Sequence, residues 1–371
     1  MADIVEKIVY HSPGLPDGYP QPMITDWKNF LENAGAEFDE HGVAHYGNLR
    51  RELSVALTGN VFADLSHYGL ISVHGEDAAD FLLSQFTNDL RDVDEAHSQF
   101  SGYCNAKGRL LATFRIFRRG DSYYLGLPAE MVESLISKLR LYVLRSKVNL
   151  EEASDTFVHL GVSGESAAAD LEKAFGALPE NIHEVVQNDD GLVIRVPGVR
   201  PGYEVFTTVE LATSLWDALN VHNAPVGADA WQLLDIEAGI PMIYPETREA
   251  FVPQMVNLQL VDGVSFRKGC YPGQEIVARM QYLGKLKRRM YRGHISSDNR
   301  PRPGDEIFPA ENATQSAGTV VSAAPFPDGG YTLLAVLQIA SAESGHPLHV
   351  GTSDGPALEL EHLPYPFQDG E

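Results

Sequence analysis

The sequence predicts an α+β protein built from two related units and followed by a small β-barrel. Three observations support this prediction. A segment at residues 73–79 recurs at residues 162–168, and strands and helices follow both copies in the same order. From about residue 289 the chain consists of short strands separated by turn-forming residues, a pattern typical of a barrel or sandwich. With 371 residues the chain is also too long for one ordinary core, so several domains are expected.

The first 155 residues supply an N-terminal segment and the first unit. Residues 11–22 are rich in proline and glycine and are expected to form a loose arm, and a short helix is expected over 27–34. We assign residues 1–47 to this segment and residues 48–155 to the first α+β unit. Apolar periodicity predicts four strands and two helices in that unit. These elements are expected at 70–74, 76–86, 100–104, 110–117, 123–127 and 129–144.

The second unit repeats this pattern. The segment Val73-His-Gly-Glu-Asp-Ala-Ala79 recurs as Val162-Ser-Gly-Glu-Ser-Ala-Ala168, and each copy ends a strand and begins a helix. The shared order of elements favours two sheets that each carry helices on one face. We assign residues 156–286 to the second unit, together with a helix and a cysteine-containing loop. Its further elements are expected at 192–196, 203–207, 209–219 and 227–239.

Residues 287–371 are assigned to the β-barrel. Short strands alternate there with Asp-Asn, Pro-Gly and Gly-Gly turns. His346 and His349 stand in this region with a proline between them, and without further ligands close by they favour a solvated loop over a metal site. No permanently bound metal is expected. The strands are expected at 292–295, 306–308, 318–322 and 331–336.

Charge and cysteine content limit the classes of function. The chain has 28 basic and 51 acidic side chains, for a net charge of −23. Such a field repels phosphate backbones, so no direct nucleic-acid partner is expected. Two cysteines are too few for a disulfide framework or for the four thiolates that hold most iron–sulfur clusters. The start lacks an apolar run and no stretch is long enough to span a bilayer, so a cytoplasmic protein without a membrane partner is expected.

The most informative stretch surrounds Cys270. Gly269 precedes it and a Pro-Gly pair follows it, so Cys270 is expected on a turn. Arg267 and Lys268 stand just before it, and neighbouring cations favour the thiolate, which is the reactive form. Gly269 leaves the sulfur accessible. A buried and inert cysteine is the alternative interpretation, because most cysteines in proteins are buried.

Three further segments suggest a binding site. The first is a turn between two predicted strands with one amide and two cationic side chains, the second is a helix with a tryptophan beside carboxylates, and the third is an extended segment with two amides. Each also has an ordinary structural interpretation. Together with the cysteine loop they outline a cleft where a flat heteroaromatic ligand can stack and form hydrogen bonds. The side chains expected there are Asn105, Lys107, Trp231, Glu237, Gln254, Asn257, Gly269 and Gln274.

The stretch Lys268-Gly-Cys-Tyr-Pro-Gly-Gln-Glu275 resembles the signature of the YgfZ family, folate-binding proteins of iron–sulfur cluster maintenance. Asp235-Ile-Glu-Ala-Gly-Ile-Pro241 and Cys104-Asn-Ala-Lys-Gly108 resemble further segments of that family. The resemblance runs from about Val61 to Tyr291. It implies a fold like that of the glycine-cleavage T-protein, a tetrahydrofolate-dependent aminomethyltransferase: a three-domain cloverleaf around a central folate pocket, with a β-barrel as its last domain.

The resemblance also implies which side chains face the folate. An aromatic residue early in the first unit lines the pocket in the family, and Tyr68 stands at that place, while Trp231 resembles a second pocket aromatic. T-proteins carry acidic residues after the Asn-x-x-Gly turn, where this chain has Ala112 and Thr113. Neither side chain can serve as a carboxylate, so aminomethyltransferase activity is not expected. The carboxylates expected near the folate are those of Glu204 and Glu237.

The function expected from the resemblance is that of a tetrahydrofolate-binding protein for iron–sulfur cluster assembly or repair, with a link to tRNA modification. Its ligand would be tetrahydrofolate or a one-carbon derivative, and its partners would be iron–sulfur client or assembly proteins. Cys270 would act as a nucleophile, a redox thiol or a transient cluster ligand, and all three roles stay open. Two alternatives also stay open: a folate-dependent one-carbon transferase, and a scaffold that docks clients without chemistry.

Overall fold

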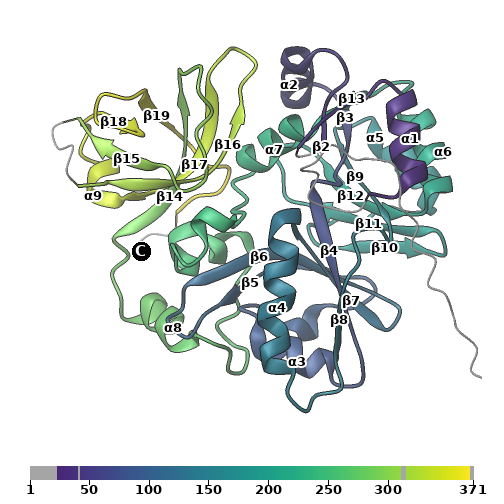
Figure 1. Ribbon diagram of the computed structural model, residues 1–371, viewed down its shortest axis with the longest axis horizontal. Coiled ribbons are helices and arrows are strands. Elements are labelled where there is room, and N and C mark those ends of the chain that lie inside the picture. The colour runs from purple at the N-terminus through teal and green to yellow at the C-terminus, as the bar shows by residue number, and fades with distance from the viewer. Residues whose placement is uncertain (1–22, 41, 311–314, 368–371) are drawn as a thin grey trace, which may run out of the picture.

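The computed structural model describes residues 23–40, 42–310 and 315–367. Two α+β units lie next to each other, and a barrel packs against helix α7 (Ala228–Glu237) on the side away from the second unit (Figure 1). The arm expected over residues 11–22 lies outside the described residues. The short helix expected after it is present as α1 (Thr25–Asn33), whose Trp27 and Leu31 are buried.

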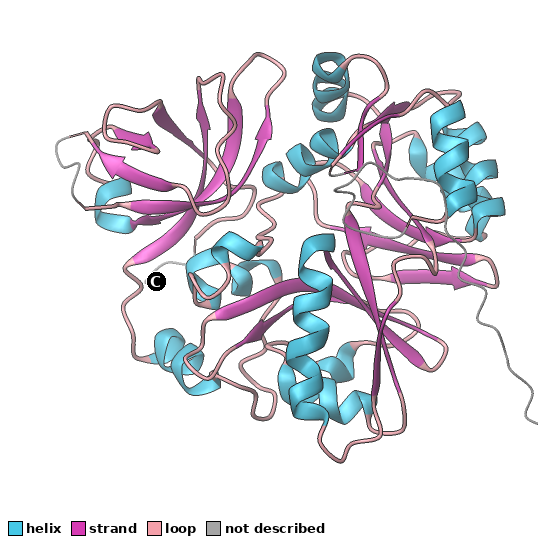
Figure 2. Cartoon of the chain, in the orientation of Figure 1, coloured by secondary structure: helices cyan, strands magenta, loops and turns pink. Residues whose placement is uncertain are grey.

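The first unit is a five-stranded sheet with the strand order β5-β6-β7-β4-β8. Two helices cover one of its faces (Figure 2). The four strands and two helices that the sequence predicted are all present, and β8 is an additional edge strand. The elements are β4 (Tyr68–His74), α3 (Ala78–Gln85), β5 (Gln99–Cys104), β6 (Leu110–Arg119), β7 (Ser122–Pro128), α4 (Val132–Val143) and β8 (Asn149–Glu152).

The second unit has a six-stranded sheet with the order β10-β11-β12-β9-β3-β13. The order β10-β11-β12-β9 repeats β5-β6-β7-β4 of the first sheet, as the internal repeat predicted. The strand β3 precedes the first unit in the chain but pairs with β9 and β13, so sheet membership departs from the sequence boundary expected between the units. The elements are β3 (Val61–Asp64), β9 (Val158–Ser163), α5 (Ala167–Phe175), β10 (Val185–Asn188), β11 (Gly191–Val196), β12 (Gly202–Thr207), α6 (Val209–Leu219) and β13 (Ala224–Val226).

The glycine of the internal repeat has the same physical role in both copies. Gly75 has φ +126° and Gly164 has φ +123°, a conformation that side chains rarely adopt. A Cβ atom at Gly75 would lie 2.2 Å from the Lys147 carbonyl oxygen, and one at Gly164 would lie 2.2 Å from Asn60 Oδ1. The repeated Gly-Glu pair therefore marks a strand-to-helix turn that a neighbouring segment crowds.

The barrel closes in the order β14-β17-β16-β15-β18-β19. The sequence predicted four of these strands and missed the last two, which are short. The barrel elements are β14 (Arg288–Ile295), β15 (Glu306–Pro309), β16 (Gly318–Pro325), β17 (Tyr331–Gln338), α9 (Ile339–Ala342), β18 (Leu348–Val350) and β19 (Ala357–Glu361). The remaining elements lie outside these sheets and the barrel: β1 (Glu37–Asp39), β2 (Gly42–His45), α2 (Leu49–Thr58), α8 (Gln274–Tyr282) and the 3-10 turns Leu90–Asp92, Ala129–Met131, Pro245–Thr247, Pro253–Val256 and Leu258–Val261.

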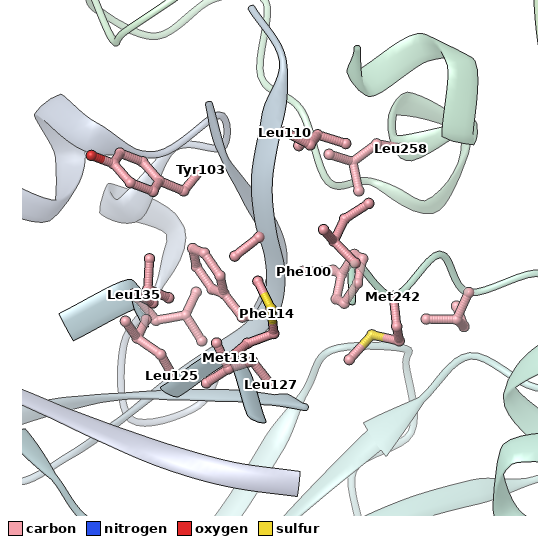
Figure 3. Close-up of a cluster of buried hydrophobic side chains, with 14 of the residues drawn as sticks. Phe100, Tyr103, Leu110, Phe114, Leu125, Leu127, Met131, Leu135, Met242 and Leu258 are labelled. Carbon is pink, nitrogen blue, oxygen red and sulfur yellow. The ribbon is translucent and has the colours of Figure 1, made fainter. Parts of the chain in front are cut away.

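The largest core cluster lies on both faces of the first sheet. On one face Phe114 packs against the covering helices, where Leu135 of α4 is buried, and on the other Phe100 faces Met242 and Leu258 from the segment after α7 (Figure 3). The segment after α7 is therefore fixed against the first sheet. In the described part of the chain, no helix has the length and apolar composition needed to cross a membrane.

Candidate functional site

A cavity lies where the two sheets and α7 meet. It consists of two adjoining hollows that share Val196, Pro197 and Asp235 in their walls. The larger hollow has a volume of about 270 Å³ and lies between the loop 196–200 and the Trp231 face of α7. The smaller one reaches Tyr68 at the start of β4. The larger volume approaches the range of about 300–1,000 Å³ that is usual for small-molecule sites.

The cavity wall contains a buried ion pair between the two sheets. Arg115 of β6 donates from Nε to Glu204 Oε1 of β12 at 3.2 Å, and His159 Nε2 lies 3.4 Å from Glu204 Oε2. Burial alone would raise the pKa of Glu204, but the Arg115 guanidinium and the His159 ring hold it at about 2. Glu204 therefore remains ionised over the whole physiological range.

A neutral histidine supports Arg115 from behind. Burial and the Arg115 guanidinium lower the pKa of His183 to about 3. Its ring is therefore neutral, and its Nδ1, 3.1 Å from Arg115 Nη1, accepts the hydrogen bond because an arginine can only donate. Arg115 was not among the residues expected at the site. Its signal in the sequence is a charged side chain in the middle of the apolar strand 110–117.

A second carboxyl group in the cavity has a different environment. The Tyr68 hydroxyl donates to Asp235 Oδ2 at 2.6 Å. Burial raises the pKa of Asp235 to about 7, a rise that the hydrogen bond from Tyr68 opposes and the negative charge of Glu204 increases. The sequence placed Asp235 on the correct helix but gave no reason to single it out from the neighbouring Glu237.

Four of the expected ligand-binding residues line this cavity: Tyr68, Glu204, Trp231 and Glu237. Trp231 lies flat against β9, since a Cβ atom at Gly161 would come within 2.5 Å of its ring. Glu237 forms an ion pair with Arg292 of the barrel. The structure therefore brings these four together from three different elements, β4, β12 and α7.

The expected amide residues Gln254 and Asn257 lie elsewhere. Both are buried, and their amide nitrogens donate to backbone carbonyls, Gln254 to Val277 at 2.7 Å and Asn257 to Met290 at 2.9 Å. They fix α8 and the first barrel strand to the core. Asn257 also has φ +57°, which explains an asparagine at this position.

The hairpin turn and the cysteine loop form a separate site. Asn105 Oδ1 accepts hydrogen bonds from the backbone N–H groups of Lys107 and Arg109, at 2.9 and 3.1 Å, so it shapes the turn. A Cβ atom at Gly273 would lie 2.5 Å from the Gly108 Cα atom, so the turn packs directly on the loop before α8. Gln274 is the first residue of α8. The two motifs were expected to meet, and they do.

This second site is distant from the cavity. The loop contacts Gly108 at the turn, whereas Arg115 lies further along the same strand, and at about 3.3 Å per residue the two are roughly 23 Å apart. The Thr113 hydroxyl between them donates to the Pro241 carbonyl at 2.8 Å and accepts from Ile243 N–H at 3.0 Å. Thr113 is therefore structural. The sequence predicted a single cleft, and this was wrong: the structure has the cavity in one place and the hairpin turn with the cysteine loop in another.

Cys270 and Cys104 differ in environment. Cys270 and the preceding Gly269 are exposed, whereas Cys104 is buried and burial raises the pKa of its thiol. Tyr271 is buried, and the nearby Cys104 thiol adds to the rise in its pKa that burial causes. The exposed thiol is the one that the sequence singled out, and the buried one belongs to the core of the first unit.

The two cations before Cys270 also differ. Arg267 is exposed, as expected of a residue that influences the thiol. Lys268 is buried, and its Nζ donates to the carbonyls of Leu83 and Phe86 at 2.5 Å each. It therefore caps the C-terminal end of α3 instead of facing the sulfur. Burial lowers the pKa of Lys268 to about 8.

Comparisons with known proteins agree with this fold. The family model described as the GCVT N-terminal domain matches residues 31–266. The tRNA-modifying protein YgfZ of Sodalis glossinidius is 32% identical over 81% of this chain and 92% of that protein. The protein of the same name from Cronobacter sakazakii is 33% identical over 82% of this chain and 93% of its own length. The chain belongs to the YgfZ family.

A solved structure extends the comparison beyond YgfZ. The glycine cleavage system aminomethyltransferase T of Bartonella henselae matches 91% of this chain and 96% of its own, with a TM-score of 0.71 and 20% sequence identity. At that identity the likeness shows the fold alone. It confirms the T-protein-like α+β architecture with a C-terminal barrel, and the YgfZ relatives confirm the family that the cysteine motif suggested. Among the described residues, no cluster of three or more metal-ligating side chains is present.

The neighbouring cations before Cys270 provide a matched test of the loop. Lys268→Met leaves two buried carbonyls without their donor, which typically costs about 1–3 kcal/mol per group. We expect it to lower the free energy of unfolding in urea by at least 1 kcal/mol, on the same basis. Arg267→Met, one residue earlier and exposed, serves as the control and is expected to stay within about 0.5 kcal/mol of the parent protein. Equal effects of the two substitutions would contradict the capping role of Lys268.

Proposed function

We propose that this chain binds tetrahydrofolate or a one-carbon derivative in the central cavity and acts in iron–sulfur cluster assembly or repair, with Cys270 as the working thiol. The observation that carries the proposal is the cavity itself. It combines an ionised carboxylate, Glu204, with an aromatic wall, Trp231, at the junction of two sheets. A reduced pterin offers a flat ring with adjacent N–H donors, which matches a carboxylate beside an aromatic face.

Glu204 has capacity for a ligand although two protein groups already contact it. An ionised carboxylate has about four lone-pair positions; Arg115 occupies one on Oε1, and His159 Nε2 lies 3.4 Å from Oε2. The ion pair with Arg115 also keeps the carboxylate ionised without water. The side chain is therefore prepared to accept from a ligand without first losing a large hydration shell.

The link to clusters and to tRNA modification rests on the relatives and on the thiol. The relatives are named tRNA-modifying proteins. We propose that this chain acts in the same process indirectly, by maintaining the iron–sulfur clusters of the enzymes that modify tRNA. Cys270 is the accessible thiol, and thiolates bind iron and exchange with disulfides. Because Cys270 lies at a distance from the cavity, its loop can contact a client protein while folate occupies the central site.

A docking scaffold is the second candidate, and the end of α8 favours it. Tyr282 is 68% exposed and Leu283 is 85% exposed, and exposed apolar side chains that lie together often mark a protein contact. Arg279 of the same helix is exposed and has no ion-pair partner among the described residues. On this view the loop and α8 recruit clients, and the thiol of Cys270 is dispensable.

Folate binding is tested with Glu204→Gln. Loss of the ionised acceptor is expected to weaken the affinity for 5-formyltetrahydrofolate at least tenfold, about 1.4 kcal/mol, measured by isothermal titration calorimetry. Glu210→Gln, on the exposed start of α6, is the control and should bind like the parent protein. Thermal unfolding of both variants verifies that they are folded. Absence of binding by the parent protein would refute the folate proposal.

The thiol is tested in cells that lack their own protein of this family. Cys270→Ser is expected to fail to restore the activity of iron–sulfur tRNA-modifying enzymes, read out from the modified nucleosides of bulk tRNA. Cys104→Ser, the control, removes a buried thiol and is expected to restore most of that enzyme activity. Full restoration by Cys270→Ser, with folate binding unchanged, would reject the working thiol and favour the scaffold.

A further inference from the structure

Asp235 occupies the junction of the central cavity. It lies on α7, lines both hollows, and is reached by Tyr68 from β4 at 2.6 Å. A ligand that fills both hollows must therefore pass over this carboxyl group. Strand β6 has Ala112 and Thr113 where the resemblance to T-proteins would place acidic residues, so in this chain it is α7 that brings a further carboxyl group to the cavity.

The two carboxyl groups of the cavity have opposite surroundings. Glu204 has a guanidinium and an imidazole as direct partners. Asp235 has a hydroxyl group, and no lysine, arginine or histidine pairs with it within the described residues. Two nearby titratable groups whose environments separate their pKa values are the usual sign of one permanently charged group and one that exchanges protons.

Four titratable or charged groups act on Asp235, and His159, Arg200 and Glu237 line the same cavity. Tyr68 of β4 donates to it, and Tyr244 from the segment after α7 lies close enough for Asp235 to raise its pKa further than burial does. Glu204 of β12 and Arg115 of β6 act on it with opposite signs. Because Arg115 is already paired with Glu204, the two charges largely cancel at Asp235, and burial decides its protonation.

We infer that Asp235 is the proton-exchanging group of the cavity, and that a flat, uncharged ring bound against it makes the protein take up one proton from solution. The inference rests on the proposed function and adds its regulation by pH. A bound ring removes the remaining water from Asp235, and loss of water favours the neutral form of a carboxyl group. Glu204 cannot take this proton, since its partners hold it ionised.

The protonated form completes the recognition of the ring. A neutral carboxyl group offers an O–H donor, whereas ionised Glu204 offers only acceptors. A cavity with one donating and one accepting carboxyl group matches a ring that has N–H donors along one edge and a nitrogen lone pair or carbonyl oxygen along another. Reduced pterins carry this combination. An analogue that lacks the acceptor would leave the Asp235 donor without a partner and lose affinity.

The expected dependence on pH follows from the pKa of Asp235, which burial raises to about 7. At pH 8 about nine-tenths of the free protein has an ionised Asp235, so binding takes up nearly one proton. At pH 6 about nine-tenths is already protonated, and the uptake falls to about 0.1 proton. Affinity therefore decreases with rising pH, approaching a tenfold loss per pH unit above 8.

The test is calorimetric titration with 5-formyltetrahydrofolate at pH 6, 7 and 8, at each pH in two buffers that hold that pH and differ in their heat of ionisation, because the difference in heat between the buffers counts the protons. The parent protein and the Glu210→Gln control should take up close to one proton at pH 8 and almost none at pH 6. Asp235→Asn should take up none at any pH while still binding. Binding by the parent protein without uptake at pH 8, or unchanged uptake in Asp235→Asn, would overturn the inference.

A second measurement needs no ligand and separates the two proposals. Carboxyl carbons are followed by NMR as a function of pH in the parent protein and in Asp235→Asn, and the signal missing from the variant belongs to Asp235. A midpoint near 7 supports the inference, and a midpoint near the ordinary value of about 4 refutes it. If no folate binds, the folate proposal fails, and this midpoint still decides the protonation of Asp235.

Discussion

The ion pair between Arg115 and Glu204 is the constraint on which the cavity depends. It joins β6 of the first sheet to β12 of the second, with both side chains largely shielded from water. Burying two charges costs more than their attraction returns unless further hydrogen bonds satisfy them. The neutral His183 accepts one such bond from Arg115, and the His159 ring lies 3.4 Å from the Glu204 carboxylate. Four polar side chains thus stand at the contact between the two sheets, in and behind the wall of the cavity.

The same region shows how the fold divides its tasks. The two sheets form the rigid sides of the cavity, and α7 closes it with Trp231 against a glycine of β9. The cysteine loop is anchored on the opposite end of the first sheet, where Thr87 accepts from Ser265 N–H through its carbonyl and donates to the Gly263 carbonyl through its hydroxyl. The cavity and the cysteine loop are thus held by one sheet at its two ends.

Much of this architecture was predictable, because it follows from short-range patterns. The repeat around Gly75 and Gly164 reflects a local backbone need, and the helix over 209–219 was predicted at its observed bounds, Val209–Leu219. What the sequence could not provide were long-range pairings. The strand β3 joins the second sheet, which no local pattern indicates. The sequence predicted Lys268 beside the thiol, because the two residues are close in the chain. Its long side chain instead reaches the end of α3.

The most direct test of the account is hydrogen–deuterium exchange with and without 5-formyltetrahydrofolate. The central claim is that the ligand site lies at the junction of the sheets and apart from the cysteine loop. The account predicts slower exchange in β4, β12 and α7, with the loop 262–273 unchanged. Slower exchange confined to that loop would contradict the account. So would unchanged exchange in β4, β12 and α7 while the ligand is bound.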